Sequence, residues 1–215
     1  MRGLIKRTFD VTVAIGGLLF LWPVLLGCAV AVRLSSPGPV LYRGIRTGLH
    51  GKPFAILKFR SMVINAEQVG GTTTAARDPR ITPVGTVLRR YKLDELPQLF
   101  NVLRGDMSVV GPRPEVAEYT DAYSAEERLI LSVRPGITDL SSLEFHDLQA
   151  IVGSGDADAT FRREVLPRKN ALRLQYVHEQ SLWLDGVILL RTIGVVCKKP
   201  FRRKVTSHDR VNQAA

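Results

Sequence analysis

The feature that most constrains this chain is an apolar run at residues 11–32, VTVAIGGLLFLWPVLLGCAVAV, in which no side chain is charged. At the rise of an α-helix, this run is long enough to cross the hydrocarbon core of a membrane. A cleaved signal peptide is disfavoured, because no compact small-residue cleavage site follows the run before SSPGPV. The chain is therefore expected to hold a helix in or on a membrane.

Pro23 lies at the middle of the run and bears on how this helix meets the membrane. Proline removes a backbone hydrogen bond and clashes with the preceding turn, so a kink is expected. Each half then reaches about 17 Å, roughly one leaflet. A straight span places its bases on one side, whereas this run is basic on both flanks, at Arg2, Lys6, Arg7, Arg33, Arg43 and Arg46. These residues slightly favour a re-entrant helix-break-helix hairpin and leave a straight span open.

The length of 215 residues suits one domain with an appended anchor. About half of the formal charge of +10 lies in the tail from residue 198 onward, which holds six Lys/Arg and one Asp. A basic balance suits nucleic acid, anionic lipid or phosphorylated small molecules, and the apolar run favours lipid. Two cysteines without a CxxC motif, and no histidine at metal-ligand spacing, argue against a disulfide framework and a zinc site.

The first half of the remaining chain is predicted to hold strands and then a loop. Short apolar runs broken by glycine and proline at 40–48 and 52–62 predict two strands or a hairpin. Residues 66–80 are rich in Gly, Thr, Asp and Pro and are expected to form a loop, with helix resuming near Thr82.

The second half is predicted to be mainly helical. Helical spacing of apolar residues is present at 115–133 and 160–179, with the polar stretch 151–160 as a linker. The run 181–197 is apolar but interrupted by two charges, which predicts an interfacial or core helix. The expected fold class is therefore a mainly helical α/β protein associated with a membrane.

The stretch LDELPQLFNVLRGDMSVVGPRP, residues 93–114, sets two adjacent carboxylates before a proline. Pro97 fits only in the first turn of a helix, so a helix is expected to begin at about Asp94 and to end before Gly105. Its amphipathic face is predicted from apolar residues at i, i+3, i+4 and i+7, namely Leu96, Leu99, Phe100 and Leu103.

Two interpretations of Asp94 and Glu95 remain open at this point. Acidic residues at a helix start are favoured as caps and by the helix dipole, each contributing about 1 kcal/mol or less. Arg89 lies just upstream, however, and Arg113 stands between two prolines that restrict its backbone. Paired carboxylates with nearby guanidinium groups also suit a site for phosphate and a divalent metal, which screens the two sets of negative charge from each other.

The same stretch resembles the signature of a known enzyme family, the monotopic polyprenyl-phosphate phosphoglycosyl transferases, which are bacterial sugar transferases. Further similar blocks occur in order along residues 4–197, namely KRTFDVTVAIGGLLFLWP, LKFRSM, DPRITPVGTVLRR, RPGIT and SLWLDGVILLRTI. The resemblance implies that a sugar 1-phosphate passes from a nucleotide sugar, usually a UDP-sugar, to undecaprenyl phosphate at the cytoplasmic face of the bacterial inner membrane. It also implies a re-entrant membrane segment with a central proline, which Pro23 matches.

The resemblance also implies roles for single residues. Asp94 matches the nucleophile that attacks the sugar-bearing phosphate, and Glu95 matches its partner with a metal or positioning role. Mg²⁺ is the expected ion, with Mn²⁺ as an alternative, and both carboxylates are candidate ligands. The resemblance matches Arg113 of the PRP motif and Arg89 to phosphate binding. Lys58 and Arg60 are further candidates for substrate binding, because they alternate around Phe59 and would share one strand face, with a merely solvated face as the alternative. Arg80 and Arg134 complete the set of candidates.

The implied organisation has three parts. Residues 1–36 are expected to form the re-entrant anchor, 37–197 the cytoplasmic catalytic domain with interfacial amphipathic helices, and 198–215 a basic, disordered tail attracted to anionic lipids. A homodimer is left open. Nucleic acid is not an expected partner, because interleaved exposed aromatics and a recognisable nucleic-acid module are absent. A catalytically silent partner of a polysaccharide assembly complex remains the alternative function.

One block departs from the commonest family pattern. After RPGIT many members continue with a Gly-Trp-Ala-Gln-Val-Asn-Gly-Arg-like run, whereas this chain has DLSSLEFHDLQAIVGSG at residues 139–155. The sugar is therefore not implied by the resemblance. His146 and Asp147 within this block are assigned a loop role, because no partner at metal or triad spacing is visible.

Overall fold

The structure is a computed structural model that describes residues 2–66, 78–145 and 157–198. Helices dominate it, and the strands form two small two-stranded sheets, which confirms the mainly helical α/β fold class. In chain order the helices and strands are α1 (Arg2–Ser35), β1 (Leu41–Thr47), β2 (Pro53–Phe59), α3 (Pro83–Arg90), α4 (Gln98–Arg104), β3 (Ser108–Val110), α5 (Ala117–Thr120), β4 (Gly136–Thr138), α6 (Leu140–Glu144), α8 (Ala157–Thr160), α9 (Leu166–Glu179) and α10 (Leu182–Lys198).

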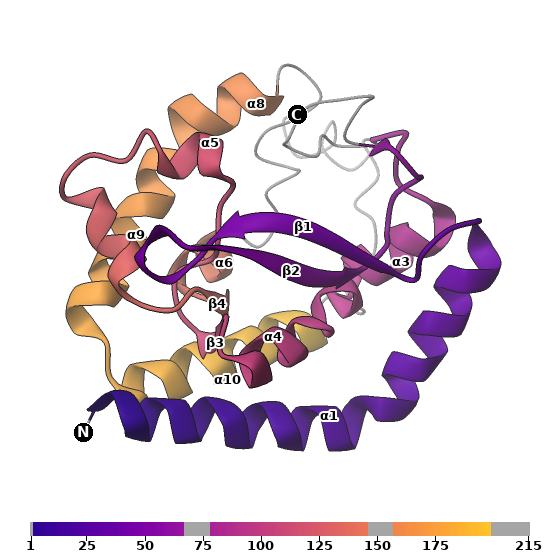
Figure 1. Cartoon of the computed structure of the whole chain (residues 1–215), viewed down its shortest axis with the longest axis horizontal. Coiled ribbons are helices and arrows are strands. Elements are labelled where there is room, and N and C mark those ends of the chain that lie inside the picture. The colour runs from indigo at the N-terminus through magenta and orange to yellow at the C-terminus, as the bar shows by residue number, and fades with distance from the viewer. Residues whose placement is uncertain (1, 67–77, 146–156, 199–215) are drawn as a thin grey trace, which may run out of the picture.

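The apolar run forms most of α1, a helix with Pro23 inside it. Figure 1 shows that α1 bends between a long first leg and a shorter second leg, which together border two sides of the molecule. A bend is the expected result of the missing proline N–H and the clash of its ring with the preceding turn. Gly3–Ser35 is long and apolar enough to cross a membrane, and large side chains such as Phe20, 86% exposed, point away from the domain.

The first leg of α1 is fixed to the domain by polar contacts near its start. Arg7 donates to the carbonyl oxygens of Val102 and Leu103 in the last turn of α4, at 2.6 and 3.0 Å. The buried carboxylate of Asp10 accepts a hydrogen bond from Ser108 Oγ at 2.9 Å. The beginning of α1 therefore lies against α4 and β3.

The second leg returns to the same domain through apolar contacts. Cys28 and Val32 share a buried cluster with Phe59 of β2 and Leu88 of α3. Both ends of the membrane-type helix are thus attached to one domain.

The first sheet is the predicted hairpin, in which β1 and β2 pair antiparallel from Leu41 opposite Phe59 to Thr47 opposite Pro53. The second sheet pairs β3 and β4 in parallel. Gly111 and Gly136 approach so closely there that a Cβ on Gly136 would lie 2.1 Å from the Gly111 nitrogen. The second sheet therefore brings the GPRP segment beside the RPGIT segment, although the two are separate in sequence.

The predicted helix at 181–197 is α10, which is both a core helix and an exposed apolar one. Ile188 lies fully buried in the main hydrophobic cluster, whereas Trp183 is 82% exposed. The helical prediction for 115–133 is largely wrong, since only Ala117–Thr120 is α-helical and Glu127–Ser132 forms a 3-10 turn. The predicted loop at 66–80 lies mostly outside the described residues, as do residues 151–156 of the predicted linker. The rest of the linker prediction is wrong, because Ala157–Thr160 forms α8.

Candidate active site

The acidic pair lies in a separate 3-10 turn, Leu93–Glu95, that precedes α4. The α-helix itself begins at Gln98 and has Pro97 as its N-cap. The expectation that the helix begins at Asp94 is wrong, because the turn before Pro97 closes with i to i+3 bonds, from Leu96 N to the Leu93 carbonyl at 3.3 Å. Helix capping therefore does not explain the pair.

Asp94 is a buried carboxylate with an unused acceptor. Asp94 lies four residues before Gln98, the first residue of α4, and is only 7% exposed. Among the described residues, none donates a hydrogen bond to Asp94 Oδ1. Burial, together with the adjacent negative charge of Glu95, raises the pKa of Asp94 above its ordinary value. A buried acceptor without a donor is costly, so this oxygen is a natural point of contact for a ligand.

Glu95 has the opposite environment. Both of its oxygens receive the Arg113 guanidinium, with Nη1 3.0 Å from Oε2 and Nη2 in contact with Oε1. Lys58 Nζ lies 3.6 Å from Glu95 Oε1. Burial alone would raise the pKa of Glu95, but the charges of Arg113 and Lys58 hold it well below its ordinary range. Glu95 is therefore a fixed carboxylate anion.

Arg113 is held at its backbone and at its side chain. Its amide N–H donates to Asp139 Oδ2 at 3.2 Å, and Nη1 donates to the Ile137 carbonyl at 3.0 Å in addition to Glu95. The flanking prolines restrict the backbone further. The second sheet supplies this support, because Ile137 belongs to β4, the strand that pairs with β3.

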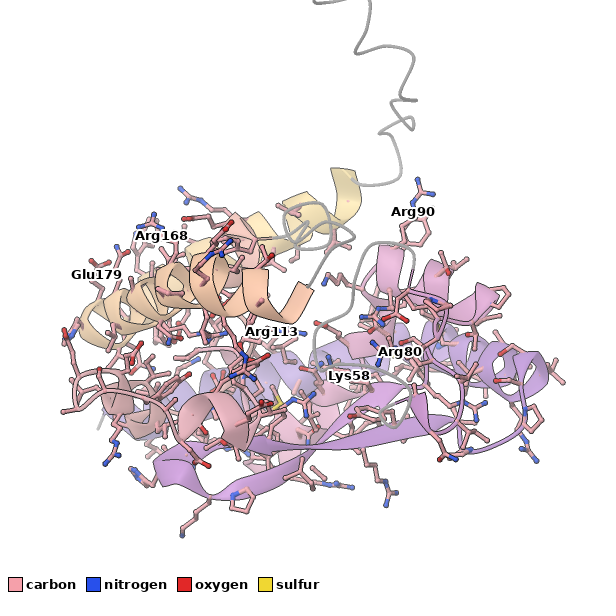
Figure 2. The ribbon with its side chains drawn as sticks, turned by 90° about the horizontal axis from the view of Figure 1, so that it is seen from above. Lys58, Arg80, Arg90, Arg113, Arg168 and Glu179 are labelled. Atoms are coloured by element: carbon pink, nitrogen blue, oxygen red, sulfur yellow. The ribbon has the colours of Figure 1, made fainter. Side chains whose placement is uncertain are left out.

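Two further bases accompany the pair. Burial lowers the pKa of Lys58 to about 8, against the opposing attraction of Glu95. Arg89 comes from the last turn of α3; burial lowers its pKa, while the charge of Asp94 acts in the opposite direction. In Figure 2, Lys58 and Arg113 lie toward the centre of the molecule, whereas Arg90 and Arg168 point outward at its periphery. Lys58, Arg89 and Arg113 are thus brought together around Asp94 and Glu95.

The other three expected substrate-binding bases make different contacts. Arg60 donates to the carbonyl oxygens of Pro37 and Ser36 at 2.5 and 2.7 Å and so holds the segment that follows α1. The Arg80 guanidinium contacts the Asp78 carboxylate, with Nη2 2.6 Å from Oδ2. Arg134 is exposed and donates from Nε to the Gly105 carbonyl at 2.9 Å, beyond the end of α4. These described contacts join none of the three to the acidic pair.

The arrangement fits a divalent ion that relies on the substrate for further ligands. No three His, Cys, Asp or Glu residues are grouped for metal binding in the part of the chain that the structure describes. Both oxygens of Glu95 are engaged by cations, whereas the buried Asp94 Oδ1 accepts no hydrogen bond from the described residues. Mg²⁺ is commonly held by one or two carboxylates, waters and substrate phosphates, so a single available carboxylate suits it.

Sequence reasoning missed the charged groups behind Arg113. Glu115, Asp139 and Arg173 are brought together there, with Arg173 Nη2 2.5 Å from Glu115 Oε1. A signal was present in α9, where the buried face carries Lys169, Asn170 and Arg173 among its apolar positions. A charged residue at an apolar position of a helix is expected to have a buried partner. His146 and Asp147 lie outside the described residues.

The model of the family described as bacterial sugar transferase matches residues 1–199. The chain belongs to this family. The match agrees with the resemblance seen in the sequence, and it spans both α1 and the carboxylate site.

Individual relatives agree with this family. A UDP-glucose:undecaprenyl-phosphate glucose-1-phosphate transferase of Escherichia coli (strain K12) is 40% identical over 88% of the chain. A UDP-N-acetylgalactosamine-undecaprenyl-phosphate N-acetylgalactosaminephosphotransferase of Aeromonas hydrophila is 38% identical over 89% of it. The chain spans only 39% and 43% of the length of these two relatives. It spans 86% of the exopolysaccharide production protein ExoY of Rhizobium meliloti (strain 1021), to which it is 38% identical.

Proposed function

We propose that this chain transfers a sugar 1-phosphate from a UDP-sugar to undecaprenyl phosphate and releases UMP. The product would be the first lipid-linked intermediate of a polysaccharide such as an exopolysaccharide. Family membership and the names of the relatives support this reaction class. Because two relatives at similar identity are named for different sugars, we leave the sugar of this chain unassigned.

The observation that carries the proposal is the contrast between two adjacent carboxylates. Glu95 is locked by Arg113 and Lys58, while Asp94 keeps a buried oxygen that accepts no hydrogen bond from the described residues. A poorly solvated carboxylate of raised pKa is a better nucleophile than a hydrated one. Asp94 is therefore assigned the attack, and Glu95 the role of holding the cations that face the phosphates.

In the first step, a carboxylate oxygen of Asp94 attacks the phosphorus that bears the sugar. A bond between Asp94 and this phosphorus forms, the bond from the phosphorus to the bridging oxygen breaks, and UMP leaves with that oxygen and its electron pair. Arg113, Lys58 and Arg89 are the described cations that can stabilise the charge on the phosphate oxygens.

In the second step, a phosphate oxygen of undecaprenyl phosphate attacks the same phosphorus. The bond to Asp94 breaks, the carboxylate is regenerated, and the sugar leaves as an undecaprenyl diphosphate-linked product. A covalent intermediate allows the two phosphorylated substrates to use one basic site in turn. One site then serves a water-soluble donor and a very long lipid acceptor.

We include Mg²⁺ in the proposal, with Mn²⁺ as a substitute. Asp94 would hold it together with phosphate oxygens of the donor, and a bound divalent ion neutralises phosphate charge. The expectation that Glu95 is a direct ligand is not part of the proposal, because Arg113 and Lys58 engage its oxygens.

For the anchor, we propose the re-entrant hairpin over residues 1–36 at the cytoplasmic face of the bacterial inner membrane. A straight span separates the two ends of a helix by the thickness of the bilayer. The described contacts instead attach Arg7 near one end and Val32 near the other to the same domain. The remaining parts of this assignment are the catalytic domain at 37–197 and the basic tail at 198–215, which anionic lipid would attract.

The experiment that tests the function follows UMP release. The purified full chain in nanodiscs is incubated with Mg²⁺, undecaprenyl phosphate and a panel of UDP-sugars that includes UDP-glucose and UDP-N-acetylgalactosamine. We expect UMP and a lipid-linked sugar from at least one donor, with both dependent on undecaprenyl phosphate. No UMP from any donor would overturn the proposal and favour a catalytically silent partner of an assembly complex.

A further inference from the structure

The GPRP segment is followed by a buried group of charges that the proposed reaction does not use. Arg173 of α9 is 0% exposed, and a guanidinium in such a place must be neutralised and hydrogen-bonded to remain stable. Its Nη2 donates to Glu115 Oε1 at 2.5 Å, its Nη1 donates to Asn170 Oδ1 at 3.0 Å, and its Nε lies 3.8 Å from Asp139 Oδ2. Two carboxylates from separate segments are thus held by one guanidinium.

Both carboxylates flank Arg113 in the structure. Glu115 is two residues after Arg113, and its carbonyl accepts a hydrogen bond from Thr47 N of β1 at 2.9 Å. Asp139 Oδ2 accepts the Arg113 amide N–H at 3.2 Å. The backbone of Arg113 is therefore set between two residues that contact the same buried arginine.

Asp139 also joins this group to α6. It is the N-cap of α6, where its Oδ1 accepts from Ser142 N at 2.6 Å and its Oδ2 accepts from Ser141 Oγ at 2.7 Å. Although burial alone would raise the pKa of Asp139, the charge of Arg173 and these hydrogen bonds lower it. Asp139 remains an anion that can accept the Arg113 amide and balance Arg173.

We propose that Arg173 is a positioning residue for Arg113: by holding Glu115 and Asp139 it sets the guanidinium of Arg113 against Glu95 and the donor phosphates. The inference rests on the proposed function, since it assigns Arg113 to phosphate binding. Arg173 itself does not touch the reacting atoms. Its Nη2 donates a directed hydrogen bond to Glu115, while its charge balances Asp139 across 3.8 Å without a hydrogen bond from Nε to any described residue. A lysine ammonium would keep the charge but not the planar donor geometry at Glu115.

The test uses the full chain carrying Asp94→Asn, which we expect to bind a UDP-sugar without turning it over. Arg173→Lys, which keeps the buried charge, is expected to weaken the Kd for the UDP-sugar about tenfold, as for the loss of a charged hydrogen bond. Its melting temperature without ligand reports on the fold alone. Arg168→Lys is the matched control on α9, because Arg168 is 59% exposed at its side chain and pairs with Glu144 at 2.9 Å; its Kd should not change.

A double-mutant cycle separates positioning from general support of the fold. If Arg173 acts through Arg113, then Arg173→Lys in a protein that already carries Arg113→Lys should weaken binding by less than about threefold. An equal loss in both backgrounds, or an unchanged Kd for Arg173→Lys alone, would overturn the inference. If the protein with native Asp94, Arg113 and Arg173 releases no UMP from any UDP-sugar, the proposed function itself fails, which is a different result.

Discussion

Arg113 and Glu95 form a two-pronged ion pair, in which Nη1 and Nη2 of the guanidinium contact Oε2 and Oε1 of the carboxylate. They come from segments 18 residues apart, and Lys58 adds a second cation at 3.6 Å from Oε1. The neighbouring Asp94 has no such partner at Oδ1 among the described residues. Glu95 is therefore a paired anion, whereas the adjacent Asp94 has an oxygen without a donor in the described part of the chain, and substitutions of the two residues are expected to have different effects.

Asp94→Asn is expected to lower UMP release at least about a thousandfold, because an amide cannot form the bond to phosphorus that the covalent route requires. The measurement is the initial rate of UMP release, combined with detection of the phosphosugar on the protein by mass spectrometry. Asp121→Asn is the control, since Asp121 is an exposed carboxylate after α5. A rate for Asp94→Asn within a few-fold of the unmodified protein would show that Asp94 is not the nucleophile.

Glu95→Gln is expected to lower kcat/KM by about ten- to a hundredfold, the range for loss of one partner of a charged hydrogen-bonded pair. The amide leaves Arg113 and Lys58 without the anion that holds them, but Asp94 can still react. The covalent phosphosugar should therefore form slowly in Glu95→Gln and be absent from Asp94→Asn. Loss of the intermediate in both variants would contradict the separate roles assigned to the two carboxylates.

Much of the architecture could be predicted from local sequence, because the signals were local. The bend of α1 (Figure 1), the hairpin of β1 and β2 and the helix start near Thr82 each follow from nearby glycine, proline and apolar spacing, although α1 continues through Pro23 without a break. The start of α4 was predicted four residues too early, at Asp94 rather than Gln98. Spacing alone cannot distinguish a 3-10 turn from the first turn of an α-helix.

The candidate site was predictable only in part, because long side chains from one strand can contact different parts of the fold. Lys58 and Arg60 are two residues apart, yet Lys58 faces Glu95 while Arg60 holds the carbonyls at Ser36 and Pro37. Asp139 and Arg173 were not found, since their roles depend on packing between α6, α9 and the GPRP segment. A sequence shows the charge of such residues but not the partner that neutralises it.

Lys58 and Arg60 offer a direct comparison of binding with stability. Lys58→Met is expected to raise the KM for the UDP-sugar about tenfold with little change in melting temperature, because a partly exposed cation beside Glu95 is lost. Arg60→Met should instead lower the free energy of unfolding by about 2 kcal/mol, since the buried Arg60 guanidinium no longer donates charged hydrogen bonds to the carbonyls of Ser36 and Pro37. Thermal unfolding and steady-state kinetics on both variants check this. A tenfold rise in KM for Arg60→Met at unchanged stability would instead show that Arg60 binds the substrate.

The proposed anchor predicts that both ends of α1 are accessible from the cytoplasm. Single cysteines are placed at Gly3, where a new Cβ meets no atom within 4 Å, and at the exposed Pro39, after the native Cys28 and Cys197 are changed to serine. A membrane-impermeant maleimide is then applied to intact spheroplasts and to inside-out vesicles.

Both sites should react in inside-out vesicles and neither in spheroplasts, because Arg7 at one end of α1 and Val32 at the other contact the same domain. A straight helix that crosses the bilayer would expose one of the two cysteines on each side. Labelling of Gly3→Cys from outside and of Pro39→Cys from inside would therefore rule out the hairpin. Labelling of both from outside would contradict the cytoplasmic placement of the domain and leave the hairpin intact.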